Sequence, residues 1–194
     1  MKIVKIIAAV LGILAVVLVV GSFFIKEDFN MEHKVHVKAP KEAVFNQLNT
    51  TGDWKNWSYW FQLDKNMSTT YTDVPSGVGA GYSWTSEKWM VGKGSFKIIE
   101  STPEEKIGYE LNFGGAEEAA NGTYLLASVN EETEITCTFS TKNSGIMGKW
   151  MSLMMKGQME KAFNESFKNM EAYFTKNPDA LKPIEPFVDT IPQL

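Results

Sequence analysis

The chain opens with a long run of residues, 6–25, that contains no charged side chain, Asn, Gln, His or Pro. As an α-helix rising about 1.5 Å per residue, these 20 residues match the thickness of a bilayer's hydrocarbon core. Lys2 and Lys5 precede the run, and lysine favours the cytoplasmic flank of a membrane helix. Residues 1–26 are therefore predicted to form a single-pass membrane anchor. The N-terminus is expected in the cytoplasm, and the remaining chain outside it, in the periplasm or the extracellular space.

A cleaved signal peptide is the alternative interpretation of this run, and it would leave the domain secreted. The apolar core of a signal peptide is usually about 7–15 residues long, which is shorter than the run seen here. Gly21 and Ser22 are small residues near its end, but they do not form a clean Ala-x-Ala cleavage site. Length and flanking charge both favour the anchor.

Residues 27–194 are acidic, with 16 lysines against 23 Asp and Glu residues, and the chain contains no arginine. This segment is long enough for one domain with a hydrophobic core and short for two. Nucleic-acid-binding proteins need basic stripes and favour the planar guanidinium of arginine. The charge pattern therefore argues against a nucleic-acid partner.

Alternating apolar and polar residues predict a strand over residues 31–38, and the segment 41–48 after Pro40 is predicted to be a helix. Six further segments, separated by turn residues, are predicted to be strands: 67–73, 80–86, 92–100, 106–113, 121–129 and 133–141. Because the links between these segments are of hairpin length, the strands are expected to form an antiparallel meander.

The densest aromatic cluster lies at residues 53–61, between the first predicted helix and the meander. Trp54, Trp57 and Trp60 are spaced by three residues, so they would share one face of a helix. Asp53 is predicted to be the N-cap of that helix. The cluster is expected to pack against the sheet, and contact with a membrane interface, which tryptophan also favours, is the alternative.

Residues 147–175 lack proline and are predicted to be helical, but their apolar residues form two stripes that point in different directions. One stripe is Met159, Phe163, Phe167, Met170 and Phe174, and the other is Met147, Trp150, Met151, Met154 and Met155. A straight helix cannot face one core with both stripes, and Gly157 lies where they change. A short helix over 147–156 and a longer one over 158–175 are therefore expected, with a break at Gly157.

Residues 177–194 hold four of the chain's seven prolines. They are predicted to form an extended, Pro-rich tail, which Phe187 and Val188 would lay across the domain. The domain itself is therefore expected to span residues 27–176.

Four sequence motifs, in order and with matching spacing, connect the chain to a known family. They are Ala39-Pro40-x-x-x-Val44-Phe45; Asp53-Trp54-x-x-Trp57-Ser58-x-Trp60; Ser76-Gly77-Val78-Gly79-Ala80-x-Tyr82-x-Trp84; and Gly92-Lys93-Gly94 followed by Glu100-Ser101-x-Pro103-x-x-Lys106-Ile107. Over residues 1–175 the chain resembles the START-like, or SRPBCC, superfamily, and within it the bacterial polyketide cyclase/dehydrase-like proteins that carry a preceding membrane helix.

The resemblance implies an α+β helix-grip fold, in which an antiparallel curved sheet of about seven strands wraps on a long C-terminal helix. It also implies an apolar cavity between sheet and helix that holds lipids, sterols, polyketides or other hydrophobic molecules. The partner expected from the resemblance is therefore a hydrophobic small molecule or a lipid.

Many inward-facing strand positions of such a fold carry large apolar side chains here, among them Tyr82, Leu125 and Phe139. These side chains could line a cavity or fill it, because burial stabilises them equally in both cases. The residues predicted to contact a ligand are Trp84, Phe96, Tyr109, Leu111, Phe113, Trp150, Met151, Met154, Met155, Met159 and Phe163.

The Met-rich segment 147–155 is hypothesised to form a compliant gate at one mouth of the cavity. Thioether side chains are flexible and polarizable, so they adapt to varied apolar surfaces. Ordinary gap-filling at the end of a core helix is the alternative interpretation.

Residues with catalytic chemistry are few in this chain. His33 and His36 are three apart on a predicted strand, so they face opposite sides and cannot share a metal ion. No metal or other cofactor is expected. His33, Tyr82 and Tyr109 are the candidates for a catalytic acid or base. Cys137 lies in an alternating strand without a histidine partner and is interpreted as a core residue.

Three functions follow from these observations. The preferred one is a membrane-anchored module that binds a hydrophobic small molecule or lipid in the cavity. The second is an enzyme of the cyclase or hydrolase type that uses the same cavity. The third is a protein-interaction domain of the cell envelope whose core is filled by its own side chains.

Overall fold

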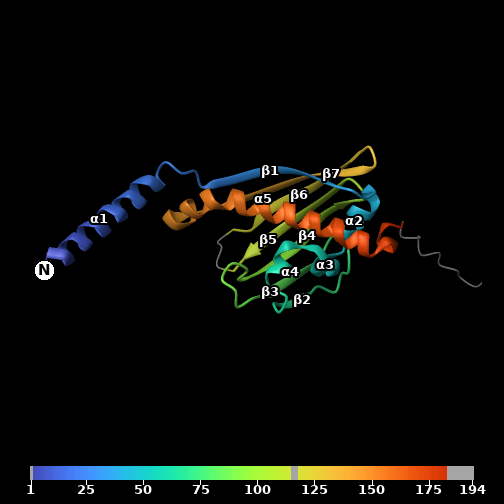
Figure 1. Cartoon of the computed structure of the whole chain (residues 1–194), viewed down its shortest axis with the longest axis horizontal. Helices are drawn as coiled ribbons and strands as arrows, with labels where there is room; N and C mark the ends of the chain where they lie inside the picture. The colour runs from blue at the N-terminus through green and yellow to red at the C-terminus, as the bar shows by residue number, and fades with distance from the viewer. Residues whose placement is uncertain (1, 115–117, 183–194) are drawn as a thin grey trace, which may run out of the picture.

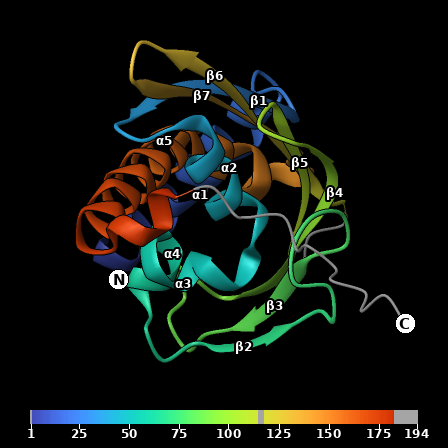
Figure 2. The same cartoon turned by 90° about the vertical axis from the view of Figure 1, so that its right-hand side faces the viewer.

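A curved antiparallel sheet of seven strands wraps around one long helix in the computed structural model, which describes residues 2–114 and 118–182 (Figures 1 and 2). The strands are β1 (Asp28–Val37), β2 (Ser68–Tyr71), β3 (Gly81–Thr85), β4 (Lys93–Thr102), β5 (Lys106–Phe113), β6 (Ala120–Val129) and β7 (Glu132–Lys142). Their order across the sheet is β1-β7-β6-β5-β4-β3-β2. The predicted α+β helix-grip fold is confirmed, and each predicted strand begins and ends within three residues of the observed one.

Five helices accompany the sheet in the described part of the chain. They are α1 (Lys2–Ser22), α2 (Lys41–Asn49), α3 (Trp54–Trp57), α4 (Tyr59–Leu63) and α5 (Gly145–Lys176), with two 3₁₀ turns, η1 (Thr51–Asp53) and η2 (Pro178–Leu181). The helix gripped by the sheet is α5, and the short helices α3 and α4 pack beside it (Figure 2).

Period-two alternation sets which face of each strand is buried. In β7, every second residue is buried: Thr133, Ile135, Cys137 and Phe139. Strand β1 pairs antiparallel with β7 along its whole length, so the first and last strands of the sheet in chain order are neighbours. Because successive side chains of a strand point to opposite faces, one face of this pair joins the core and the other faces water.

Strand β6 has the opposite phase to the one predicted. Leu125 was expected to face inward, and this prediction is wrong, because Leu125 is exposed while Tyr124 and Leu126 are buried. Two adjacent leucines leave the phase of a strand ambiguous, and a slip of one residue exchanges the two faces. Pairing with β5 decides the phase, since it places Tyr124 opposite the buried Ile107.

The aromatic cluster forms two short helices instead of one. Ser58 has an extended backbone (φ −62°, ψ 131°) and separates α3 from α4. Trp54 and Trp57 are therefore buried together, whereas Trp60 belongs to the next helix and is only half-buried. Asp53 occupies the predicted N-cap position of α3, but η1 already gives this residue a helical backbone, and its side chain makes no capping hydrogen bond.

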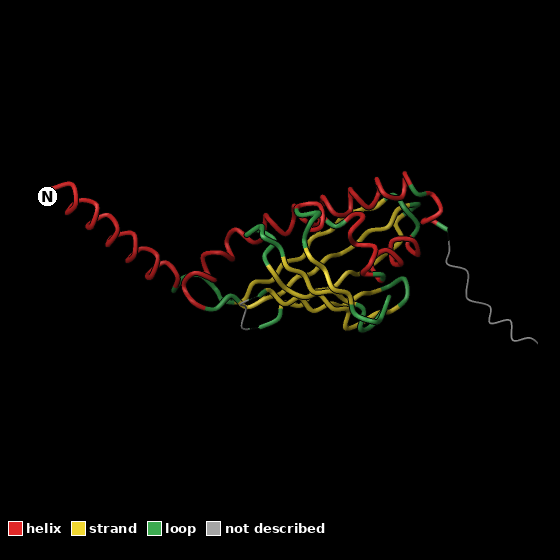
Figure 3. The backbone as a smooth tube through the Cα atoms, turned by 90° about the horizontal axis from the view of Figure 1, so that it is seen from below, coloured by secondary structure: helices red, strands yellow, loops and turns green. Residues whose placement is uncertain are grey.

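The C-terminal helix α5 is continuous over 32 residues, so the predicted break at Gly157 is wrong. The two apolar stripes do not need to face one core, because the first turns of α5 extend past the ends of the strands (Figures 1 and 3). Met147, Met151 and Met154 of these turns are exposed. A glycine inside a helix costs about 1 kcal/mol, which the packing of later turns offsets.

Apart from Lys2 and Lys5, helix α1 carries no charged residue, and its residues 2–20 are exposed. Among the described residues it is the one helix whose length and composition suit a membrane span. It projects from the end of the domain where β1 and α5 begin (Figure 3).

The predicted extended tail begins with the 3₁₀ turn η2, whose Ala180 and Leu181 pack against the core. This part of the tail is therefore not extended. The predicted contacts of Phe187 and Val188 lie outside the described residues.

Candidate functional site

Aromatic rings occupy the space between the sheet and α5. The ring centroid of Trp54 lies 4.4 Å from that of Phe96 and 5.1 Å from that of Trp57. The ring of Phe96 lies 5.2 Å from that of Tyr109, which in turn lies 5.1 Å from Tyr124. All five side chains are buried. The centre of the interior is therefore packed with the protein's own rings.

Polar contacts and one glycine hold these rings in place. The indole N–H of Trp54 donates to the carbonyl of Leu48 at 3.1 Å, near the end of α2. The hydroxyl of Tyr109 donates to the carbonyl of Thr138 at 3.2 Å, on β7. Gly122 pairs with Tyr109 across β5 and β6, and a Cβ atom at this position would overlap the Tyr109 ring. Because glycine has no side chain, residue 122 leaves room for the ring of Tyr109.

The residues predicted to contact a ligand divide into two groups by depth. Those that are buried in the packed core are Trp84, Phe96, Tyr109, Met159 and Phe163. A shallower group is half-buried or exposed, and we call it the open-end residues: Leu111, Phe113, Met151, Met154 and Met155. Of these two groups, only the open-end residues have apolar surface left for another molecule.

The open-end residues of β5 and those of α5 lie at the same end of the domain. Strands β5 and β7 run in the same direction, because β6 lies antiparallel between them. The end of β5, which carries Leu111 and Phe113, is thus the end at which β7 leads into α5. Figure 1 shows the arrow of β5 pointing toward the side where α5 begins.

The helical repeat places Met151 on the flank of α5 that faces α3. Met151 and Asn169 are 18 residues apart, which is about five turns, so they share one flank. The side-chain amide of Asn169 donates to the carbonyl of Trp57 in α3 at 3.2 Å. Because α3 and α4 are short, they cover this flank only along the later turns of α5. The flank at Met151 remains uncovered and 59% exposed.

Trp150, also predicted to contact a ligand, lies on a different flank of α5. Its indole N–H donates to the carbonyl of Leu18 in α1 at 3.0 Å. The side chain therefore contacts α1 instead of the interior of the domain.

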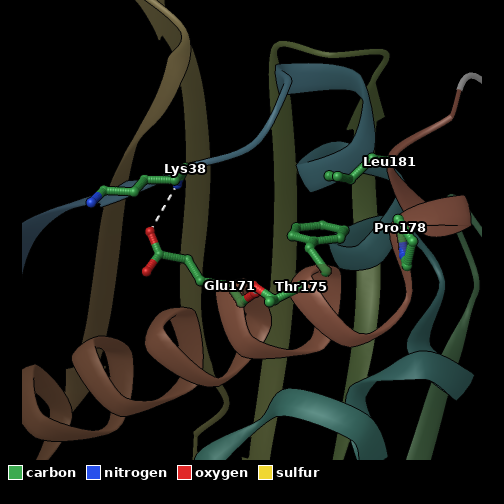
Figure 4. Close-up of a pocket in the computed structure, with 6 residues that line it drawn as sticks. Lys38, Glu171, Thr175, Pro178 and Leu181 are labelled. Carbon is green, nitrogen blue, oxygen red and sulfur yellow. Dashed lines mark hydrogen bonds between the residues drawn. The ribbon is translucent and has the colours of Figure 1, made fainter.

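Two shallow hollows lie on the described surface. The first, of about 270 Å³, lies at the C-terminal end of α5, where the carboxylate of Glu171 accepts a hydrogen bond from the backbone N–H of Lys38 at 2.8 Å (Figure 4). The second, of about 320 Å³, lies at the ends of β3, β4 and β5 beside Trp84 and Phe113. The second hollow adjoins the open-end residues, and the first lies at the opposite end of α5.

The structure does not bring the catalytic candidates together. His33 lies on the edge strand β1, while Tyr109 and Tyr82 lie on β5 and β3, separated from it by two and four strands. The Nε2 atom of His33 lies 2.9 Å from Oδ1 of Asn164 in α5. Burial raises the pKa of the Tyr82 and Tyr109 hydroxyls well above the usual value. Both hydroxyls therefore stay protonated near neutral pH.

Cys137 is fully buried in β7, and burial raises the pKa of its thiol. Because the thiolate is the reactive form, the folded protein is expected to react with a maleimide at least about 100-fold more slowly than the urea-unfolded chain. Mass spectrometry of the labelled fraction over time measures this ratio. Equal rates in the two states would show that β7 opens readily.

These features define a class of protein, the START-like helix-grip domains, in which a curved sheet grips a C-terminal helix around an apolar interior. The chain belongs to the family described as Activator of Hsp90 ATPase homolog 1-like protein (AHSA1), whose family model matches residues 38–175. The START-like resemblance drawn from the four motifs is thereby confirmed. No curated protein has a sequence that matches this chain significantly.

Solved structures share the fold at low sequence identity. A Rhodobacter sphaeroides protein matches with a TM-score of 0.57 and 14% identity, covering 77% of this chain and 93% of its own. An HSP90 activator from Plasmodium falciparum matches with a TM-score of 0.52 and 16% identity, covering 76% of this chain and 96% of its own. DynU16, from the dynemicin biosynthetic locus, matches with a TM-score of 0.51 and 14% identity, covering 79% and 48%. At these identities the likeness concerns the fold alone.

Sequence reasoning missed the central role of Tyr124. This side chain contacts Trp54, Tyr109, Phe163 and Phe167. The available signal was the polar Asn121, which faces water and so places the even-numbered residues of β6 inward.

Proposed function

We propose that the chain is a membrane-anchored module that binds a hydrophobic small molecule or lipid at the open end of its helix-grip domain. One observation carries the proposal: the flank of α5 at Met151 and Met154 is apolar and exposed, at the same end of the domain as the apolar ends of β3 and β5. Burial of apolar surface contributes about 25 cal/mol per Å², so a ligand that covers these side chains is stabilised mainly by the hydrophobic effect.

The packed interior limits how deep such a ligand reaches. The ring of Phe96 contacts those of Trp54 and Tyr109, so the ligand lies between the first turns of α5 and the strand ends instead of beneath the whole helix. The thioether side chains of the open end adapt to the ligand's shape, as the gate hypothesis requires. The same packed interior favours a second candidate, a protein-interaction domain of the envelope with a filled core.

The anchor belongs to this proposal. Helix α1 is long and apolar enough to cross a bilayer, and Lys2 and Lys5 favour a cytoplasmic N-terminus. The mass of the mature chain distinguishes an uncleaved anchor from a signal peptide. Loss of about the first 20 residues would contradict the anchor and leave the binding site in a secreted domain.

A charge placed at the open end is expected to weaken lipid binding. Met151→Lys puts an ammonium where an acyl chain would lie, which should lower the fraction of chains with a bound lipid about tenfold. Native mass spectrometry of the full chain, released from detergent after incubation with phospholipid, measures this fraction.

Leu153→Lys is the matched control. Leu153 is 60% exposed and Met151 is 59% exposed, so both lysines are equally accessible. Leu153 lies about five turns before Glu171, which contacts Lys38 at the end of β1, so it points away from the open end. The control should bind lipid as the unchanged chain does. A chain that stays empty with every lipid offered would refute the binding function and favour the protein-interaction domain.

A further inference from the structure

The end of α1 and the beginning of α5 are joined by several contacts. The indole N–H of Trp150 donates to the carbonyl of Leu18 at 3.0 Å. The Trp150 ring lies against Gly21 so closely that a Cβ there would be 2.6 Å from it. Beside them, Nζ of Lys149 lies 3.2 Å from a carboxylate oxygen of Glu27. The first turns of α5 are therefore held against the last turns of α1.

This junction lies within the uncharged run of the chain. Leu18 is seven residues before Ile25, the last residue of that run. Helix α1 ends at Ser22, so at about 1.5 Å per residue the Leu18 carbonyl lies about 6 Å before the end of the helix, and three more uncharged residues, 23–25, follow it. A side chain that touches Leu18 and Gly21 therefore lies at the depth of the outer part of the bilayer, where tryptophan is favoured.

The first turns of α5 have the apolar surface that contact with the bilayer interior requires. Between residues 143 and 155 the only charged side chain is Lys149, which pairs with Glu27. Large apolar side chains on several flanks are exposed: Ile146, Met147, Met151, Leu153 and Met154. From Lys156 onward, the outward residues become charged, as at Glu160 and Lys161. The apolar surface of α5 thus ends about three turns from its start.

We infer that residues 145–155 of α5 are immersed in the outer leaflet of the membrane beside α1. The inference rests on the proposed anchor. Exposing these five apolar side chains to water is unfavourable, whereas burying them in the leaflet stabilises the contact of α5 with the membrane. The Lys149–Glu27 pair then lies where the headgroups begin, since long lysine side chains extend toward the interface. An acyl chain of the outer leaflet reaches the open-end residues without crossing water.

Site-specific fluorescence tests this immersion in the full chain reconstituted in phosphatidylcholine vesicles. Because Cys137 is buried, single cysteines can be labelled with an NBD maleimide in the otherwise unchanged chain. Leu153→Cys is the reporter, since this residue points away from the open end and does not sense a bound ligand. Ala172→Cys, exposed near the other end of α5, is the control in water, and Val10→Cys is the control in α1.

Nitroxide-labelled lipids are expected to quench the label at residue 153 at least about threefold more than the label at residue 172. Strong quenching at residue 10 with weak quenching at residue 153 would overturn the immersion of α5 and leave the anchor standing. Weak quenching at residue 10 would refute the anchor, and with it the inference.

Gly21→Leu displaces Trp150 from α1 and is expected to reduce quenching at residue 153 while residue 10 is unaffected. Unchanged quenching at residue 153 in this variant would contradict the role of the junction.

Discussion

Replacing Trp54 with alanine is expected to lower the free energy of unfolding by about 3–5 kcal/mol, the range for removing a large buried aromatic side chain. The Trp54 ring contacts those of Trp57, Tyr82, Phe96 and Tyr124. Its removal leaves a cavity in the middle of the aromatic packing and a carbonyl of Leu48 without its donor. The rings around the cavity belong to three strands and α3, so they cannot all move in to fill it.

Urea unfolding of the full chain in detergent, followed by far-UV circular dichroism, measures this loss. Trp89→Ala is the control, because Trp89 is 89% exposed and its removal should change the free energy by less than about 0.5 kcal/mol. A loss below about 1 kcal/mol for Trp54→Ala would mean that the interior collapses onto the vacated space or was never tightly packed. Lipid binding to the Trp54→Ala variant at greater depth would be a further sign of such a cavity.

The second large effect is expected from Gly122→Ala, at about 1–3 kcal/mol of destabilisation, the range for overpacking a core. The added Cβ would overlap the ring and hydroxyl of Tyr109 and lie 2.5 Å from the carbonyl oxygen of Thr138. The backbone oxygen cannot rotate away, and the ring is held by Phe96 and Tyr124. The strain must therefore be relieved by displacing β5, β6 or β7.

Gly52→Ala is the matched control, since nothing lies within 4 Å of a Cβ atom at that position. It should leave the unfolding midpoint nearly unchanged. In the double variant Tyr109→Ala with Gly122→Ala, the combined loss should be smaller than the sum of the single losses, because removing the ring removes most of the overlap. Additive losses would show that Tyr109 is not the obstacle.

The sequence alone supported much of the fold because its signals are local. Alternation along 106–113 and 133–141 predicted β5 and β7 closely, and an uncharged run predicted the apolar helix α1. Each of these patterns depends on residues within one element, where the geometry of a strand or a helix is the same in every protein. The open-end methionines were also visible, since an accumulation of thioethers needs no knowledge of distant residues.

What the sequence could not decide depended on contacts between distant segments. Adjacent Leu125 and Leu126 left the phase of β6 ambiguous until pairing with β5 selected Tyr124 for the interior. Gly157 suggested a break in α5, but a helix whose first turns lie beyond the sheet has no single core to face. The contact of Trp150 with Leu18 joins residues 132 positions apart, and no local pattern specifies it.

The amino-acid sequence by itself determined the alternating strands, the apolar N-terminal helix and the supply of aromatic and thioether side chains, because period and hydrophobicity act over neighbouring residues. Only the tertiary structure decided which of those side chains fill the interior and which remain exposed at the open end. That division follows from volume and chain direction: the rings brought together by α3 and the central strands fill the interior, while the early turns of α5 extend past their cover.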